Sequence, residues 1–242
     1  MAQRFTLFGV TFSTYWTVFA LGALMMFVLN CFRGKRKNIG IIKAVLLTFG
    51  AIAISFIGAK ILYYIENPQK LITNGLRFDG VSFFGSVFLV PVAMCLLAKA
   101  FRMDYYRLLD YISPSLMLML AVLRIGCLLT GCCGGVTMTT PLTTFVFPSQ
   151  IVECVIDLLI MIGLLLYEKF WTTTGRLYFF IMVYYGVFRF LLEFFRDTPK
   201  DWMGLSHGQW FAVISVCVGG YMLAYLGKRD KAQAKKSRYA KK

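Results

Sequence analysis

The chain has 242 residues, of which 59% are hydrophobic and only 15% are charged, and its formal net charge is +15 at pH 7. Soluble domains carry about 25% charged residues, so this composition excludes an ordinary soluble protein and predicts an integral membrane protein. The excess of positive charge alone would suit a nucleic-acid-binding protein, but its distribution along the chain argues against nucleic acid as a partner.

Seven segments are apolar and long enough to span a bilayer, which takes about 20 residues each. They cover approximately residues 7–32, 39–65, 81–101, 108–130, 150–168, 177–195 and 208–227. The first segment runs directly into a basic loop and lacks a signal-peptide cleavage site, so we interpret it as a span. The expected fold is an all-α, polytopic membrane protein, with a transmembrane domain at 1–227 and a basic cytoplasmic tail at 228–242.

The basic residues predict the orientation of these spans. Seventeen of the 26 Lys and Arg residues lie in four stretches, at 33–37, 99–107, 169–176 and 228–242. These stretches occur at every second connection between spans, as cytoplasmic segments do under the positive-inside rule. We therefore expect the N-terminus outside and the C-terminus in the cytoplasm, where the tail would bind anionic membrane lipids.

The first two spans carry polar side chains near their outer ends. Tyr15 lies beside Trp16, and both residue types favour the membrane interface. Lys60 near the end of the second span either extends outward to the interface or lines a pocket. Ser82 lies at the outer end of the third span, and Gly85 follows it.

The chain is organised around the segment Leu123–Gly135. Arg124 lies at membrane depth, where a charge is costly and usually faces a cavity that marks a site. Gly126 and Gly135 follow within this segment, and glycines let the backbone turn tightly and approach a bound group closely. The segment predicts the floor of a polar pocket.

The fifth and sixth spans add charges at the same depth. Glu153 shares a helix face with Asp157, and this face must point inward. Arg189 and Glu193 are spaced to pair along the sixth span. At the start of the seventh span, Ser206 is placed to cap the helix.

These charged residues are expected to converge. Arg124, Glu153, Arg189 and Glu193 all lie toward the outer ends of the fourth, fifth and sixth spans. One outward-opening pocket with a positive balance is the simplest interpretation. Two buried guanidiniums suit a phosphate group, which they can bind through paired hydrogen bonds.

Three cysteines follow Arg124 closely, at Cys127, Cys132 and Cys133. Zinc sites usually show a second cysteine pair or histidines, and the only histidine, His207, is distant in sequence. We therefore predict neither a metal site nor a cofactor. A disulfide, a packing role and a reactive thiolate activated by Arg124 remain open for Cys132 and Cys133.

Several linked motifs resemble one known family, the bacterial prolipoprotein diacylglyceryl transferases. The resemblance runs through nearly the whole chain, in the motifs Ser13–Tyr15, Gly58–Pro68, Asp79–Ser86, Arg124–Gly135, Phe147–Glu153, Gly186–Arg196 and Leu205–Gln209. It implies transfer of diacylglyceryl from phosphatidylglycerol to the thiol of a lipobox cysteine in a prolipoprotein, with release of glycerol phosphate. It also implies a bacterial plasma membrane protein whose active site faces outward.

The resemblance assigns roles to individual residues. The catalytic residues would be Arg124 and Arg189, which hold the phosphate, and Glu153 or Glu193, which accepts the thiol proton. The substrate-binding residues would be Tyr15, Lys60, Ser82, Gly85, Gly126, Gly135 and Gln150.

The departures from the family pattern lie in the chemistry. Cys127, Thr130 and Cys132 stand where the family has two asparagines and a glutamate, and Phe84 and Phe147 replace two histidines. Two alternatives follow from these departures. One is a related transferase with another acceptor and a cysteine as covalent relay. The other is a non-catalytic phospholipid-binding or transport protein that keeps the pocket.

Overall fold

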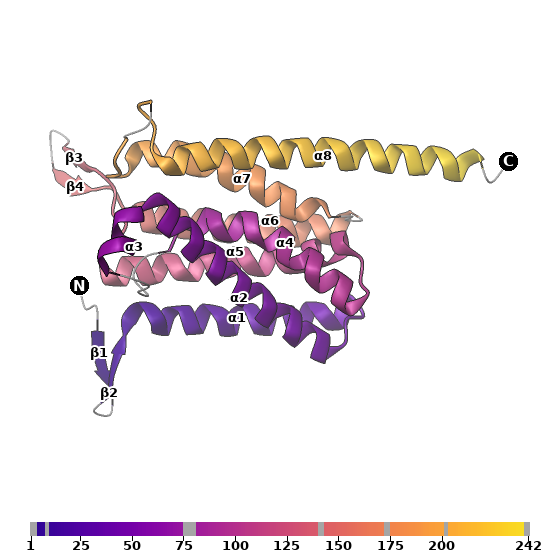
Figure 1. Ribbon diagram of the computed structural model, residues 1–242, viewed down its shortest axis with the longest axis horizontal. Coiled ribbons are helices and arrows are strands. Elements are labelled where there is room, and N and C mark those ends of the chain that lie inside the picture. The colour runs from indigo at the N-terminus through magenta and orange to yellow at the C-terminus, as the bar shows by residue number, and fades with distance from the viewer. Residues whose placement is uncertain are drawn as a thin grey trace.

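The computed structural model describes residues 4–7, 10–74, 81–139, 143–171, 175–200 and 203–239. Seven helices in this part of the chain are long and apolar enough to cross a membrane. They are α1 (Thr14–Arg36), α2 (Ile41–Glu66), α4 (Phe83–Phe101), α5 (Tyr105–Thr130), α6 (Ser149–Phe170), α7 (Arg176–Leu192) and α8 (His207–Tyr239), as Figure 1 shows. The predicted helical class and the predicted number of spans are confirmed.

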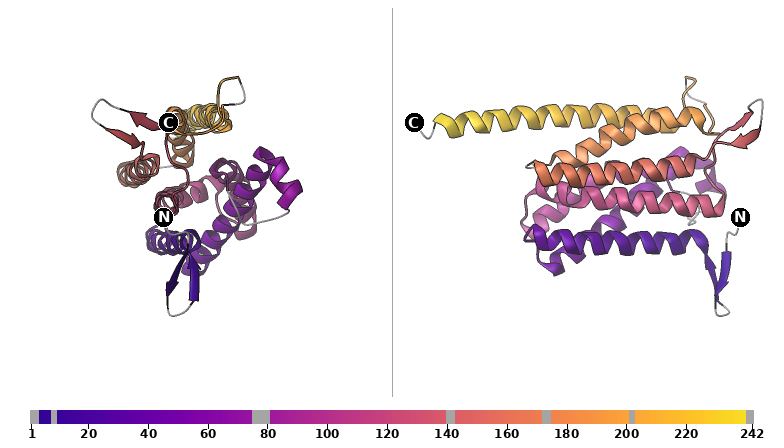
Figure 2. Two further views of the ribbon diagram at one scale, coloured as in Figure 1. Left: turned by 90° about the vertical axis from the view of Figure 1, so that its left-hand side faces the viewer. Right: turned by 180° about the vertical axis from the view of Figure 1, so that it is seen from behind.

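The remaining elements are short. They are the antiparallel hairpins β1 (Arg4–Leu7) with β2 (Val10–Ser13) and β3 (Thr137–Thr139) with β4 (Thr144–Val146), the helix α3 (Pro68–Asn74) and the 3-10 turn η1 (Glu193–Phe195). Both hairpins and α3 lie at one end of the helix bundle, here called the hairpin end (Figures 1 and 2). The C-terminal part of α8 extends from the opposite end.

The structure differs from the sequence-based prediction in three places. The first span was expected from residue 7, but α1 begins at Thr14, because Val10–Ser13 alternates apolar and polar side chains in the manner of a strand. The connection between α5 and α6 contains β3 and β4, which were not predicted. Helix α8 continues through Tyr239, so the start of the basic tail prolongs the last span; residues 240–242 lie outside the described part.

Helix α5 is the central element of the bundle. It packs against α1, α4, α6 and α7, and its side chains Leu108, Ile112, Met117 and Leu120 are buried. Lipid tails are as apolar as leucine, so close packing, rather than transfer from water, stabilises such contacts between spans. This packing fixes the axis of α5, whose last two turns present Arg124 and Cys127 at the hairpin end.

Helices α2 and α4 cross where two glycines meet. A Cβ on Gly58 would lie 2.5 Å from the Gly85 carbonyl oxygen, and a Cβ on Gly85 would lie 2.0 Å from that of Gly58. Ser86 Oγ donates to the Ser55 carbonyl beside them, at 2.7 Å. Small residues of this kind let two backbones approach closely in a membrane.

A network of polar contacts ties the helices together at the opposite end. Arg33 pairs with Glu168 at 2.8 Å and donates to the Asp110 carbonyl at 3.1 Å. The Asp110 carboxylate accepts from Gly175 N at 2.7 Å and Leu177 N at 2.9 Å, which satisfies free N–H groups at the start of α7. These bonds join α1, α5, α6 and α7 at the end of the bundle opposite the hairpins.

Candidate active site

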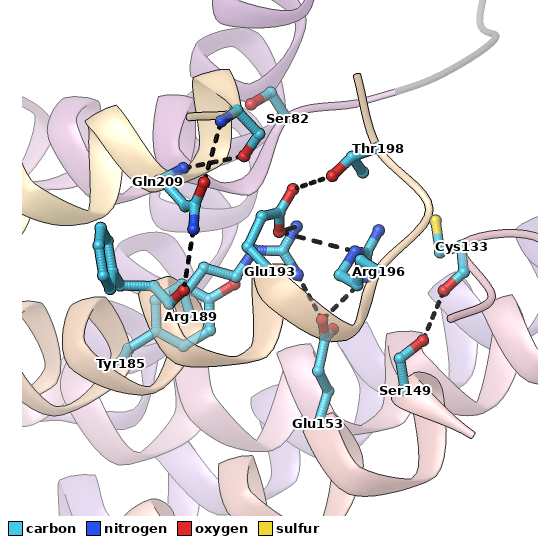
Figure 3. A network of polar contacts seen from close by, with 12 residues as sticks. Ser82, Cys133, Ser149, Glu153, Tyr185, Arg189, Glu193, Arg196, Thr198 and Gln209 are labelled. Atoms are coloured by element: carbon cyan, nitrogen blue, oxygen red, sulfur yellow. Dashed lines mark hydrogen bonds and ion pairs between the residues drawn. The ribbon is translucent and has the colours of Figure 1, made fainter. Parts of the chain in front are cut away.

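A buried carboxylate at the hairpin end gathers three guanidiniums. Glu153 lies near the start of α6 and is 0% exposed. Its Oε1 accepts hydrogen bonds from Arg189 and from Arg196 Nη1, the latter at 2.9 Å, as Figure 3 shows. Its Oε2 forms an ion pair with Arg124. The three arginines come from the ends of α5 and α7 and from the residue after η1. Glu153 therefore links three separate segments to α6.

A second buried carboxylate shares two of these arginines. Glu193 Oε2 lies 2.9 Å from Arg189 Nη2 and 3.7 Å from Arg196 Nε. Its Oε1 accepts from Thr198 Oγ1 at 2.9 Å (Figure 3). The predicted pairing of Arg189 with Glu193 along α7 is confirmed, and Arg189 bridges the two carboxylates.

The ion pairs are largely shielded from solvent. The side chains of Arg124, Arg189 and Arg196 are 11%, 13% and 8% exposed. Buried charges are tolerated only when they are paired and hydrogen-bonded. Three guanidiniums against two carboxylates leave this ion-paired network with one positive charge. The network therefore favours an anion, and guanidiniums suit the oxygens of a phosphate.

A backbone contact with the loop after α5 positions Arg196. Arg196 pairs with Gly135 in an antiparallel bridge, and Val136 N donates to the Phe195 carbonyl at 2.9 Å. Gly135 N donates to the Phe147 carbonyl at 3.1 Å. Three backbone segments thus meet at Gly135, and this junction holds Arg196 over Glu153.

The loop after α5 brings the three cysteines together. Gly131 ends the helix in the left-handed conformation, with φ 72°, and Cys132 N bonds the Cys127 carbonyl at 3.1 Å. This is the Schellman arrangement, in which the side chains at these two positions often come into contact. Cys133 is also left-handed, with φ 59°, which is uncommon for a residue with a Cβ. The three Sγ atoms lie within 4.8 Å of one another.

The start of α6 holds this cysteine loop in place. Ser149 Oγ donates to the Cys133 carbonyl at 2.8 Å (Figure 3), and Gln150 Nε2 donates to the Cys132 carbonyl at 2.7 Å. Hydrogen bonds from the Cys127 and Cys132 thiols, together with the charges of Arg196 and Arg124, hold the pKa of the Cys133 thiol well below its usual range. The loop is thus a fixed cluster of thiols beside the arginines.

The first turn of α8 supports the other side of the site. Ser206 Oγ accepts from Gln209 N at 3.2 Å, and Gln209 Oε1 accepts from Ser206 N at 3.0 Å. This is a capping box, and it confirms the predicted cap at Ser206. Gln209 Nε2 also donates to the Phe190 carbonyl at 3.4 Å, which joins α8 to the turn of α7 that carries Arg189 (Figure 3).

The predicted substrate-binding residues fall into two groups. Gln150, Gly135, Gly126 and Tyr15 surround the cysteine loop and Arg124; the Tyr15 ring lies 3.6 Å from the position that a Gly126 Cβ would take. Ser82, Lys60 and Gly85 lie in or beside the α2 and α4 helix pair. Ser82 Oγ donates to the Glu66 carboxylate at 3.0 Å, and Lys60 Nζ lies 5.5 Å from the centre of the Tyr63 ring. Gly85 contacts Gly58 where the two helices cross. In the same motif, Asp79 and Gly80 lie outside the described residues.

Several residues that build the site were not predicted from the sequence. Arg196 belongs to the Gly186–Arg196 motif but was given no role, although its spacing from Glu193 places the two on one face. Tyr185 was also missed; it is buried, and its hydroxyl accepts from Arg124 Nη2 at 3.4 Å. The bonds of Ser149 and Thr198 depend on tertiary contacts that carry no local sequence signal.

An apolar groove lies apart from these charges, between α1 and α2. Its lining residues are Trp16, Phe19, Phe49, Ile52, Ala53 and Phe56. The lining contains no charged side chain and none of the predicted site residues. The predicted site residues therefore lie outside this groove, in the charged network, the cysteine loop and the α2 and α4 helix pair.

Comparison with known proteins identifies the family. Residues 3–225 match the family model of prolipoprotein diacylglyceryl transferase. Proteins named phosphatidylglycerol–prolipoprotein diacylglyceryl transferase from Clostridium tetani and Clostridium perfringens are each 27% identical, over 89% and 92% of this chain and 93% of each relative. One from Bordetella parapertussis is 30% identical over 70% of this chain and 69% of its own length. The chain therefore belongs to the prolipoprotein diacylglyceryl transferase family.

Proposed function

We propose that this protein transfers the diacylglyceryl group of phosphatidylglycerol to the cysteine thiol of a prolipoprotein in a bacterial membrane. The names of its relatives state this donor and this acceptor. The observation that carries the proposal is the ion-paired network of Arg124, Arg189 and Arg196 with Glu153 and Glu193. Its guanidiniums outnumber its carboxylates, and guanidiniums bind the oxygens of a phosphodiester through paired hydrogen bonds.

The reaction requires stabilisation of charge on a leaving phosphate. The acceptor sulfur attacks the glyceryl carbon bonded to the phosphate oxygen, and the electron pair of the broken C–O bond passes to that oxygen. Glycerol phosphate leaves with one additional negative charge. In this proposal Arg124 and Arg189 bind these oxygens, and preorganised donors in a shielded site stabilise developing charge without rearranging.

The proposal places the active site at the outer face of the membrane, with the N-terminus outside and the C-terminus inside. Two features support this orientation. Basic residues gather at the connections opposite the hairpin end, as the positive-inside rule requires of the cytoplasmic side. The charged network lies at the hairpin end, where an acceptor outside the cell could reach the exposed Cys132 and Cys133 loop.

A reconstituted reaction tests the proposal. Purified protein in phosphatidylglycerol vesicles receives a peptide with a lipobox cysteine, and mass spectrometry follows the peptide; the Clostridium tetani relative is the positive control. We expect the peptide to gain one diacylglyceryl group, and a Cys-to-Ser peptide to gain none. If the relative transfers the group while this protein only binds the lipid, the transferase proposal is wrong and the protein is a lipid-binding member of the family.

A further inference from the structure

The proposed reaction needs an acceptor thiolate, and the carboxylates of the site are poorly placed to produce one. A thiol has a pKa of about 8.5 and is mostly protonated near neutral pH. Glu153 contacts three guanidiniums, and Glu193 contacts two and a hydroxyl. Their oxygens are therefore already engaged, and the one histidine of the sequence, His207, is not among their contacts in the described residues. A group other than Glu153 and Glu193 is therefore needed to hold the sulfur as a thiolate.

The cysteine loop has the composition and the geometry for this task. Tetrahedral zinc with bonds of about 2.3 Å to sulfur places its ligands ~3.8 Å apart. The Sγ atoms of Cys127, Cys132 and Cys133 lie within 4.8 Å of one another, so shifts of about 1 Å at each side chain suffice. The sequence did not predict a metal site because it contains no second pair of ligands. In the structure, the left-handed conformations of Gly131 and Cys133 bring a third cysteine close to the other two.

We propose that Cys127, Cys132 and Cys133 bind a zinc ion, and that the fourth ligand position takes the sulfur of the acceptor cysteine. This inference rests on the proposed function. Catalytic zinc sites typically have three protein ligands and one open position. Cys127 is buried while Cys132 and Cys133 are exposed, so the open position faces the surface from which an acceptor arrives.

The surroundings fit such a site electrostatically. Zinc neutralises two of the three thiolate charges, and the third lies beside cationic groups. Arg124 precedes Cys127 by three residues, which places both on one face of α5. Figure 3 shows Cys133 next to Arg196. Ser149 and Gln150 bind the carbonyls of the loop and restrict its movement, so the ligands lose little freedom on binding the ion.

A thiol that binds zinc is deprotonated, and its proton passes to water at the exposed side of the loop. The sulfur lone pair then forms the S–C bond to the glyceryl carbon while the C–O bond breaks toward the phosphate. Arg124 connects the cysteine loop with the ion-paired network, since it precedes Cys127 by three residues on α5 and pairs with Glu153. No oxidation or reduction is involved.

Metal binding is measured first, without any turnover. Full-length protein purified in detergent under reducing conditions is depleted with a chelator and titrated with zinc and with cobalt. We expect one ion per chain and a sulfur-to-cobalt charge-transfer absorption. Cys127→Ser and the double variant Cys132→Ser/Cys133→Ser should lose both signals, while the matched control Cys154→Ser/Cys217→Ser, outside the cluster, should keep them. Zinc should also protect wild-type Cys132 and Cys133 from maleimide, which tests the site without a variant.

The acceptor is tested next by adding the lipobox peptide to the cobalt-loaded protein. The absorption should change with the cysteine peptide and not with its serine counterpart. If wild-type protein transfers diacylglyceryl without bound metal, the zinc inference is wrong and the transferase proposal stands. If the protein binds metal and the cysteine peptide yet never alkylates it, the transferase proposal is wrong and the metal site stands.

Discussion

Gly135 and Arg196 pair across an antiparallel bridge that joins the cysteine loop to the end of η1. This pairing depends on the absence of a side chain at Gly135. A Cβ there would lie 2.6 Å from the Phe147 carbonyl oxygen and 2.7 Å from that of Phe195. The bridge therefore couples the thiol cluster to the arginine that binds Glu153, and it does so through backbone contacts alone.

Replacement of this glycine should disrupt both parts of the site. Overpacking typically costs about 1–3 kcal/mol, so Gly135→Ala should lower the thermal unfolding temperature and reduce transfer. Gly134→Ala is the matched control, because its Cβ would meet no atom closer than 3.8 Å. Thermal unfolding in detergent and the vesicle transfer assay are the measurements. Equal stability of the two variants would contradict the role assigned to Gly135.

Neutralising the Glu153 carboxylate should lower stability more than Gly135→Ala does. Glu153→Gln removes the charge shared by Arg124, Arg189 and Arg196 and leaves three guanidiniums with one carboxylate. Breaking a buried ion pair in this way costs about 3–5 kcal/mol. The variant should unfold at a markedly lower temperature and lose transfer.

Asp157→Asn provides the control for this substitution. Asp157 lies one turn further along α6 and is also fully buried, but its carboxylate oxygens have no hydrogen-bond partner among the described residues. The same carboxylate-to-amide change therefore breaks no hydrogen bond there, and we expect a smaller loss of stability. If both variants lose stability equally, burial rather than the arginine network determines the effect.

The spans and the charged network could be predicted because each has a local signature. Apolar runs of the right length locate the helices, and a charge within such a run must face inward, which brings Arg124, Glu153 and Arg189 to one depth. The bridge between Gly135 and Arg196 could not be predicted, because it joins residues 61 positions apart through backbone atoms. No periodicity reports a contact of this kind.

The cysteine cluster could be predicted from the sequence only in part. The contact between Cys127 and Cys132 follows from a Schellman turn at Gly131, a motif with a recognisable glycine. The approach of Cys133 depends on a left-handed conformation that its own residue type does not favour. Bonds from Ser149 and Gln150, which belong to the next helix, restrain that segment.

The proposed orientation can be tested directly in cells. A tag fused after Lys242 should be inaccessible to an antibody or protease until the cells are permeabilised, because the basic connections place the C-terminus inside. A tag before residue 1 should be accessible in intact cells. Accessibility of the C-terminal tag in intact cells would reverse the topology and remove the outer-face assignment of the site.

The arginines should discriminate between phospholipids. Removing one partner of a hydrogen-bonded charge pair typically costs about 2–5 kcal/mol. At about 1.4 kcal/mol per factor of ten, Arg124→Ala or Arg189→Ala should weaken phosphatidylglycerol binding by roughly 30-fold or more. Lysine at either position should restore little of the phosphatidylglycerol binding, because an ammonium group cannot reproduce the planar, two-pronged contact of a guanidinium. Arg36→Ala, at an exposed position at the end of α1, should bind as wild type does.

Binding of labelled lipid to purified protein in detergent measures this effect. Phosphatidylglycerol should bind more tightly than a zwitterionic lipid of the same acyl composition, because its head group brings no cation to compete with the guanidiniums for the phosphate. The preference should shrink in both alanine variants, since the excess positive charge of the network is removed with either arginine. Thermal unfolding of the same samples separates lost binding from lost folding. If both folded variants keep wild-type affinity and preference, Arg124 and Arg189 serve only as ion-pair partners of Glu153, and phosphate binding must be assigned elsewhere.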